Sequence, residues 1–143
     1  MSNSVLAFDY GKRRIGIATG SGITGTASVL TTLSSVSGEP DWSSIEKIIR
    51  EWKPDTLIVG MPYNMDGSES EMSGLASEFA TTLNTRYQLP VELVDERLSS
   101  AEASSILKEQ RRQGLRTKKV NKTEIDSLAA CLIAETWLRS NAT

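Results

Sequence analysis

The chain opens with a strand–turn–strand pattern that constrains how its fold can begin. The apolar residues 5–8 end at one carboxylate, Asp9, and a turn through Gly11 and a basic cluster leads into a second apolar run at residues 14–19. This pattern predicts two β-strands joined as a hairpin. Asp9 then lies at the carboxyl end of the first strand. There it either shapes the turn by bonding to the backbone of Gly11 or belongs to a functional site.

The rest of the pattern predicts an α/β domain in which strands come first and helices later. A β-branched run at residues 27–32 extends the hairpin to an antiparallel meander, and short apolar runs at residues 56–59 and 90–96 alternate with helical segments. Right-handed crossovers would pair these later strands in parallel. We therefore expect a five-stranded mixed β-sheet flanked by helices. The length of 143 residues suits one domain that spans residues 1–143.

Four segments have the apolar spacing of helices that pack one face against a sheet. Ser68 and Glu71 have the spacing of a capping box before the second helix. Ser99 and Glu102 have the same spacing before the third, and the last helix covers about residues 122–138. The residues expected to be buried are Ile45, Ile48, Ile49 and Trp52, then Met72, Leu75, Ala76, Phe79, Ala80 and Leu83, then Ala103, Ile106 and Leu107, and finally Ile125, Leu128, Ala129 and Leu132.

The composition excludes several kinds of chemistry. The chain has no histidine, so it has neither a Ser-His-Asp nor a Cys-His site, nor an ordinary zinc site of His and Cys. Its one cysteine, Cys131, lies in a helical apolar pattern and is expected to be a small buried hydrophobe. No apolar run approaches the roughly 20 residues of a membrane helix, and the start lacks a secretory pattern. We expect a cytoplasmic protein without a membrane partner.

Three acidic positions, far apart in the sequence, are expected at one edge of the sheet. Asp9 and Glu96, which follows Asp95, lie at the carboxyl ends of strands, where open α/β sheets bind ligands. Asp126 lies in the first turn of the last helix, at the border of its buried face. Converging carboxylates repel one another unless a divalent cation neutralises them, and Mg²⁺ or Mn²⁺ is the natural candidate. Such a site could hydrolyse phosphodiesters.

Each acid also has a purely structural interpretation. Asp126 comes three residues after Thr123 and could cap the last helix. Asp95, Glu96 and Arg97 could form a surface ion-pair cluster, worth at most about 1 kcal/mol. The spacing alone leaves both interpretations open.

Positive charge is concentrated in one segment of an otherwise acidic chain. Residues 108–122 contain seven basic residues and one acid, whereas the whole chain has a net charge of −2. A local contact with a polyanion and a solvated loop are both compatible with this distribution. The seven basic residues are Lys108, Arg111, Arg112, Arg116, Lys118, Lys119 and Lys122.

Six ordered motifs between residues 5 and 138 resemble the YqgF family. Its members are described as Holliday junction resolvases and as nucleases of pre-16S ribosomal RNA. The motifs are Asp9-Tyr10-Gly11, Arg14-Ile15-Gly16-Ile17-Ala18, Val59-Gly60-Met61-Pro62, Asn64-Met65-Asp66-Gly67-Ser68, Val94-Asp95-Glu96-Arg97-Leu98 and Asp126-Ser127-Leu128-Ala129-Ala130. The resemblance implies an RNase H-like fold and a cytoplasmic nuclease that trims the 5′ end of precursor 16S rRNA.

The resemblance also implies roles for single residues. Asp9, Glu96 and Asp126 match the metal-binding acids of the family, with Asp95 as the alternative to Glu96. The residues expected to face nucleic acid are Arg14, Asn64, Arg97, Arg111, Arg112, Arg116, Lys118, Lys119 and Lys122.

The leading hypothesis is thus a nuclease that uses Mg²⁺ or Mn²⁺ on precursor rRNA, with ribosomal assembly intermediates among its partners. One alternative is a Holliday junction resolvase that acts on branched DNA and would need a dimer; an RNA-trimming enzyme could be a monomer or a weak homodimer. Another is a non-catalytic RNA-binding module for ribosome assembly. An actin-like ATPase would need two domains, and the chain has no Walker-type glycine loop.

Overall fold

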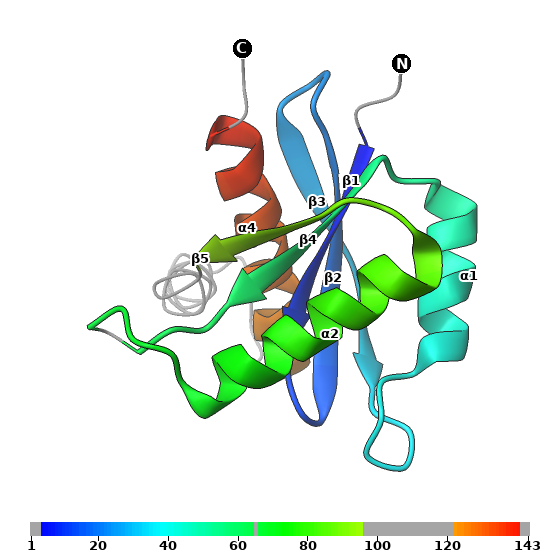
Figure 1. Cartoon of the computed structure of the whole chain (residues 1–143). Coiled ribbons are helices and arrows are strands. Elements are labelled where there is room, and N and C mark those ends of the chain that lie inside the picture. The colour runs from blue at the N-terminus through cyan, green and yellow to red at the C-terminus, as the bar shows by residue number, and fades with distance from the viewer. Residues whose placement is uncertain (1–3, 65, 96–121, 141–143) are drawn as a thin grey trace, which may run out of the picture.

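The strand that carries Asp9 is the central strand of the sheet in the computed structural model of the protein (Figure 1). The structure describes residues 4–64, 66–95 and 122–140, and of residues 122–124 and 140 the backbone alone. The strands are β1 (Ser4–Tyr10), β2 (Arg14–Ser21), β3 (Thr26–Ser34), β4 (Thr56–Met61) and β5 (Val91–Asp95), in the order β3-β2-β1-β4-β5. The helices are α1 (Trp42–Trp52), α2 (Glu71–Tyr87) and α4 (Lys122–Ser140).

Strand directions in this sheet follow the sequence pattern. β1, β2 and β3 pair antiparallel as a meander, whereas β4 pairs in parallel with β1 and β5 in parallel with β4. The inner strands β1 and β4 are buried on both faces, which is why they read as continuous apolar runs. The predicted five-stranded mixed sheet with flanking helices is confirmed.

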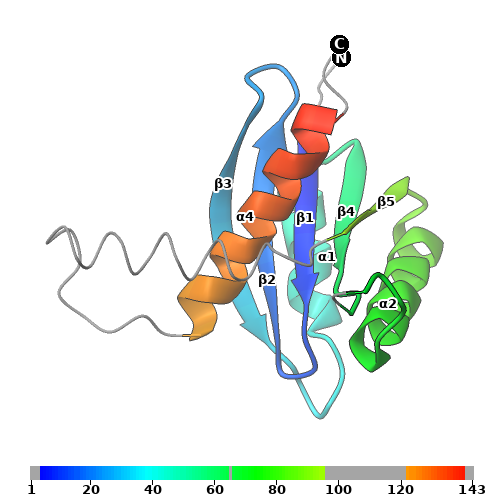
Figure 2. The same cartoon turned by 90° about the vertical axis from the view of Figure 1, so that its left-hand side faces the viewer.

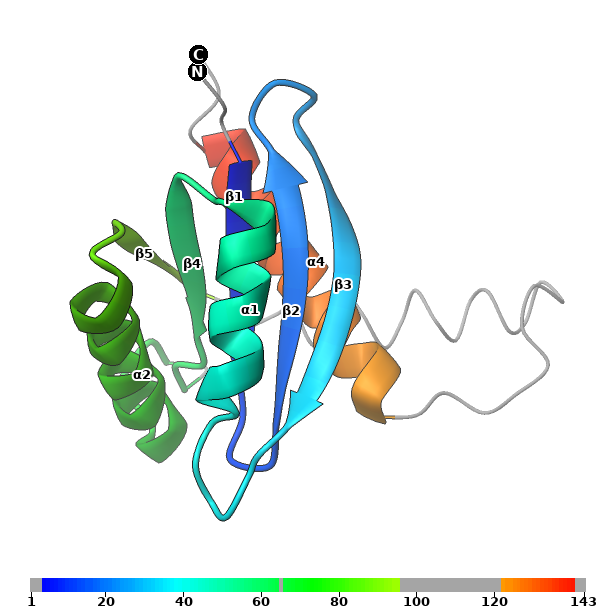
Figure 3. The ribbon, with the colours of Figure 1, turned by 90° about the vertical axis from the view of Figure 1, so that its right-hand side faces the viewer.

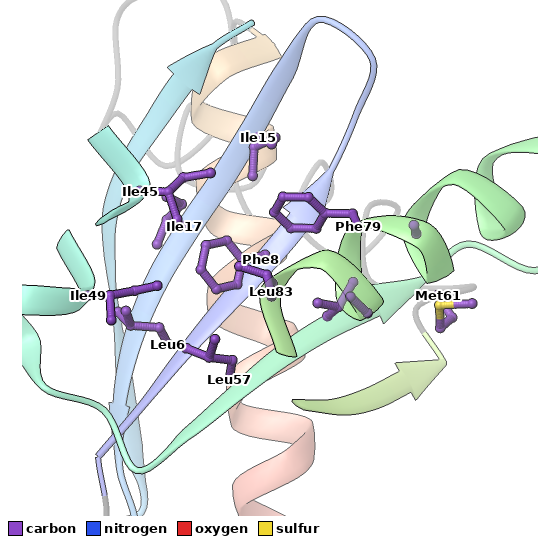
Figure 4. Close-up of a cluster of buried hydrophobic side chains, with 13 residues drawn as sticks. Leu6, Phe8, Ile15, Ile17, Ile45, Ile49, Leu57, Met61, Phe79 and Leu83 are labelled. Carbon is purple, nitrogen blue, oxygen red and sulfur yellow. The ribbon is translucent and has the colours of Figure 1, made fainter. Parts of the chain in front are cut away.

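Helices cover the sheet on both faces. Figure 3 shows α1 in front of β1 and β2, with α2 beside β4 and β5. Figure 2 shows α4 running across the other face, over β1, β2 and β3. The face under α1 and α2 holds the larger hydrophobic cluster, in which the rings of Phe8 and Phe79 meet edge to face with centroids 5.6 Å apart (Figure 4).

The alternation of side chains along β1 decides which residues meet α4. Leu6 and Phe8 belong to the cluster under α1 and α2, whereas Val5 and Ala7 pack with residues of α4. Because successive side chains of a strand point to opposite faces, Asp9 lies on the α4 face. The sheet thereby directs the carboxylate that ends β1 toward the last helix.

The start of α2 differs from the prediction. The N-cap is Ser70, not Ser68, and the reciprocal capping bonds join Ser70 to Ser73, not to Glu71. Ser68 instead bonds to Asp66 within the preceding loop. The error arose because several serines and acids near this helix satisfy the capping spacing in more than one register. The expected helix after residue 99 lies outside the described residues.

The buried face of α4 also differs from the prediction. Of the predicted positions, Ala129 is buried as expected, whereas Ile125, Leu128 and Leu132 are only half-buried. Ala130, Ile133 and Ala134 are buried as well. Large apolar residues indicated the wrong stripe, because a helix lying close to a sheet buries its small residues. On α1, Ile45 and Ile49 are buried as expected, but Trp52 is 46% exposed. Among the residues that the structure describes, no helix combines the length and apolar character of a membrane span.

The corrected cap makes a stability prediction. Ser70 Oγ accepts a hydrogen bond from Ser73 N and donates one to the carbonyl of Pro62. We expect Ser70→Ala to lower the free energy of unfolding by about 1 kcal/mol, measured by urea denaturation. Ser68→Ala, the matched control, is expected to cost less than about 0.5 kcal/mol because it changes an exposed loop. A larger loss for the Ser68 variant would contradict this assignment of the cap.

Candidate active site

The last helix touches the sheet backbone to backbone at Gly16. A Cβ atom on Gly16 would collide with the carbonyl group of Asp126 and lie 2.9 Å from Ser127 N. Glycine in a strand interior often marks such a close approach of another backbone. The absent side chain of Gly16 therefore allows α4 to bring Asp126 directly against β2.

The same glycine is also the neighbour of Asp9 in the sheet. The antiparallel register places Asp9 opposite Gly16. Residues directly opposite each other in a sheet have their side chains on the same face. The face on which Gly16 meets Asp126 is therefore the face that carries the side chain of Asp9. Both predicted acids therefore adjoin Gly16 on one face of the sheet, with Asp9 at the end of β1. Asp126 lies in the second turn of α4, not in the first turn as expected from the sequence, because the helix begins at Lys122.

A third charged residue completes this group. Arg14 lies on β2 two residues before Gly16, and its Nε donates a hydrogen bond to Asp126 Oδ2 at 2.9 Å. The exposed fractions of the two side chains are 29% and 24%, so the ion pair is half-buried. The resemblance to the YqgF family implies a contact of Arg14 with nucleic acid, which the structure does not test and which stays a prediction. The contact that the structure gives Arg14 is with an acid of the candidate site.

The turn beside Asp9 carries a further ion pair on the surface. Lys12 Nζ lies 2.9 Å from Glu71 Oε1 at the start of α2, and both side chains are exposed. The hydrogen bond and charge of Lys12 hold the pKa of Glu71 below its usual value. Two of the three basic residues of this turn, Lys12 and Arg14, thus have acidic partners, and the neighbouring Arg13 is exposed.

Asn64 shapes the loop that follows β4. Its Nδ2 donates to Ser68 Oγ at 3.0 Å and to the carbonyl of Glu69 at 3.2 Å, and its backbone bonds to Ser68 and Gly67. These bonds close the loop at the carboxyl end of the strand next to β1. The predicted contact of Asn64 with nucleic acid is not tested by them and stays a prediction.

The alternation of side chains along β5 distinguishes Asp95 from Glu96, the two candidates for the third acid. Asp95 is opposite Met61, and Met61 belongs to the cluster under α1 and α2. Asp95 therefore lies on the face away from Asp9, while its neighbour Val94 packs toward α4. Glu96 lies outside the described residues.

The residues present suit a hard divalent cation in part. Asp9 and Asp126 offer carboxylate oxygens, the ligands that Mg²⁺ and Mn²⁺ prefer. Within the described ranges, no cluster of three or more His, Cys, Asp or Glu residues could hold a metal ion. The described part of the chain thus supplies two of the three expected ligands.

The predicted nucleic-acid contacts other than Arg14 and Asn64 fall elsewhere in the chain. Of these, the structure describes only the backbone of Lys122, at the start of α4. Those outside the described residues are Arg97, Arg111, Arg112, Arg116, Lys118 and Lys119.

Cys131 has the predicted structural role. It is 7% exposed and packs with Ala18 and Ala130 between α4 and the sheet. Burial, together with the nearby Glu135, raises the pKa of its thiol to about 11. The thiolate is therefore scarce at neutral pH, and the cysteine is unsuited to nucleophilic catalysis.

Comparison with known proteins places this arrangement in a family. The family described as "RuvX: Holliday junction resolvase" matches residues 3–140. A Haemophilus ducreyi protein named "Putative pre-16S rRNA nuclease" is 49% identical over 141 residues, 99% of each chain. A Pseudomonas putida protein of the same name is 46% identical over 137 residues, 96% of this chain and 95% of the other. The chain belongs to the RuvX family, the YqgF family that its motifs resemble.

Solved structures share the fold at low sequence identity. RuvC of T. thermophilus, in complex with a Holliday junction substrate, has a TM-score of 0.57 and 15% identity, and the match covers 96% of both chains. The fowlpox virus resolvase, in complex with substrate Holliday junction DNA, has a TM-score of 0.56 and 14% identity over 96% of this chain and 97% of the other. These likenesses confirm the predicted RNase H-like fold.

Sequence reasoning did not identify Gly16 as a residue that builds the site. Its signal was present, because a glycine between two isoleucines inside a strand indicates close approach of another backbone. The pairing of Arg14 with Asp126 had no comparable signal, since 112 positions separate the two residues.

The contact at Gly16 makes a second stability prediction. We expect Gly16→Ala to displace the start of α4 and lower the free energy of unfolding by about 1–3 kcal/mol, the usual cost of overpacking. Chemical denaturation measures this loss. Gly74→Ala is the control, because a Cβ atom at Gly74 in α2 has open space and should stabilise the helix by about 0.5–1 kcal/mol. Equal stability of the two variants would refute the tight contact.

Proposed function

We propose that the protein is a metal-dependent endonuclease that processes the 5′ end of precursor 16S rRNA. The observation that carries this proposal is the position of Gly16, which is paired with Asp9 in the sheet and whose backbone lies against that of Asp126. Two carboxylates from distant parts of a chain that adjoin the same glycine on one face of a sheet are suited to binding a divalent cation. The full-length relatives named as pre-16S rRNA nucleases support the substrate.

Each residue of the group has a distinct part in this proposal. Asp9 and Asp126 would hold Mg²⁺ or Mn²⁺ through their carboxylate oxygens, and Gly16 lets the backbone of Asp126 lie against β2. Arg14 orients Asp126 through its Nε contact. A divalent cation bound there would supply Lewis-acid activation of water and charge stabilisation during phosphodiester hydrolysis.

We assign the third acid to Glu96 rather than Asp95. This assignment is supported by the face on which Asp95 lies. Asp95 is paired with Met61 on the face covered by α2, away from Asp9. A ligand from this end of β5 therefore has to come from a neighbouring position, and Glu96 is the adjacent acid.

Binding of the substrate is assigned to the basic residues. Residues 108–122, with seven basic residues and one acid, would neutralise RNA phosphates together with Arg97. Recognition by the shape of folded RNA needs no sequence-reading side chains. We place this activity in the cytoplasm, with the chain acting on ribosomal assembly intermediates as a monomer or weak homodimer.

Branched DNA is the second candidate substrate, and the description of the RuvX family as Holliday junction resolvases favours it. A four-way DNA junction and a precursor rRNA fragment offered to the same preparation would separate the two. Cleavage of the junction alone would overturn the RNA assignment, and binding of RNA without cleavage would favour an assembly module.

Neutralising either acid of the group should abolish cleavage. We expect Asp9→Asn and Asp126→Asn to slow Mg²⁺-dependent cutting of a precursor 16S rRNA fragment at least about 100-fold, because each removes a charged cation ligand. Gel assays with Mg²⁺ and with EDTA measure this. Metal-dependent cleavage that survives Asp9→Asn would rule out the site.

The neighbouring acids of β5 provide a matched pair for the same assay. Glu96→Gln is expected to lose activity like the Asp9 variant, whereas Asp95→Asn should retain it within about threefold. Both variants remove one negative charge, so a general electrostatic effect would change them alike. Loss of activity in the Asp95 variant alone would reverse the assignment of the third ligand.

The basic segment should control binding rather than cutting. Replacing Lys118 and Lys119 by Ala should weaken RNA binding and reduce the slope of log affinity against log salt by about 1–2, because two phosphate contacts are lost. Filter binding at several salt concentrations measures both effects. An unchanged salt slope would remove these lysines from the interface.

A further inference from the structure

The half-buried ion pair of Arg14 and Asp126 engages an acid that the proposed function also assigns to a metal. Arg14 Nε bonds to Asp126 Oδ2 at 2.9 Å, so this oxygen already has a cationic partner. Arg14 and Gly16 lie two residues apart on β2 and share the face that carries Asp9. The guanidinium therefore belongs to the same charged group as both acids.

We propose that Arg14 is a built-in competitor of the divalent cation, a positioning residue that sets how tightly the acid site binds metal. The guanidinium and the cation compete for the carboxylate of Asp126. A cation must weaken the Arg14 contact to gain full use of this ligand. This inference rests on the proposed function, because it takes Asp9 and Asp126 as metal ligands.

Charge determines the direction of the effect. Asp9 and Asp126 together carry two negative charges when ionised, and Arg14 reduces the total to one. Removing the guanidinium raises the negative potential felt by a doubly charged cation, and at separations of several ångströms this interaction is appreciable even in water. The loss of orientation at Asp126 acts in the opposite direction. It is the smaller effect because α4 is fixed by its backbone contact at Gly16.

The same charge stabilises the protein while no cation is bound. Without Arg14 the acids would repel one another, and the half-buried carboxylate of Asp126 would lose its ion-pair partner. Arg14 therefore reduces the repulsion between the acids in the metal-free protein, and the same contact lowers their affinity for metal. An ion pair that only fastened α4 to β2 would affect stability equally with and without metal.

The chain offers matched variants for a test. Arg14→Gln removes the competitor, and Arg14→Lys keeps its charge. Arg13→Gln removes the same charge from the exposed neighbouring position, where solvent and salt screen it. All three variants are used as the full chain without nucleic acid, with Mn²⁺ binding followed by calorimetry and thermal unfolding recorded with EDTA and with saturating Mg²⁺.

We expect Arg14→Gln to bind Mn²⁺ about tenfold more tightly than the original chain. It should also unfold at a lower temperature in EDTA and gain more thermal stability from Mg²⁺, since stabilisation by a ligand grows with affinity. Arg14→Lys should bind within about threefold of the original chain, and Arg13→Gln within about twofold.

Two outcomes separate this inference from the proposed function. If Asp9→Asn abolishes Mn²⁺ binding but Arg14→Gln leaves the affinity unchanged or weaker, the competitor role is wrong and the metal site stands. If the original chain binds no Mn²⁺, or Asp9→Asn binds it normally, the metal site is wrong and the role of Arg14 falls with it.

Discussion

The contact between the backbone of α4 and Gly16 is the constraint on which the candidate site depends. A helix can approach a strand this closely only where side chains are absent or small. Gly16 meets the contact on β2, and Ala130 and Ala134 face the sheet from α4. The register that pairs Gly16 with Asp9 then places the acid of β1 beside the start of the helix. The absence of a side chain at Gly16 thereby allows the start of α4 to lie against the strand that pairs with Asp9.

The order and direction of the strands were predictable because they depend on simple periodicity. Runs such as residues 56–59 read as buried parallel strands, and the hairpin turn at Gly11 required antiparallel neighbours. The face of α4 was not predictable in the same way. Large apolar side chains dominate a hydrophobicity pattern, whereas close packing of a helix on a sheet selects alanine. The error at Ser68 and Ser70 has a similar origin, because cap spacing alone does not choose a register.

Only those residues of the candidate site that lie at the ends of strands or helices could be predicted from the sequence. Asp9 and Asp126 were recognisable by their positions at the end of a strand and near the start of a helix. The choice between Asp95 and Glu96 was ambiguous, because Leu93 and Val94 are both apolar and hide the alternation along β5. The pairing of Asp95 with Met61 shows on which face of the sheet the side chain of Asp95 lies. The ion pair of Arg14 with Asp126 is a tertiary contact between distant residues, so no local sequence pattern could predict it.

The distribution of charge around the site suggests that different parts of the chain bind the substrate and carry out the chemistry. In the turn next to Asp9, Lys12 is paired with Glu71 and Arg14 with Asp126, so much of its positive charge is balanced locally. Paired cations attract a polyanion weakly, because their fields cancel beyond a short distance. The concentrated charge of residues 108–122 is a stronger source of attraction for a nucleic-acid backbone than these paired residues. We infer that this segment holds the substrate while the edge at Gly16 carries out the chemistry, so that binding and cleavage can be impaired separately.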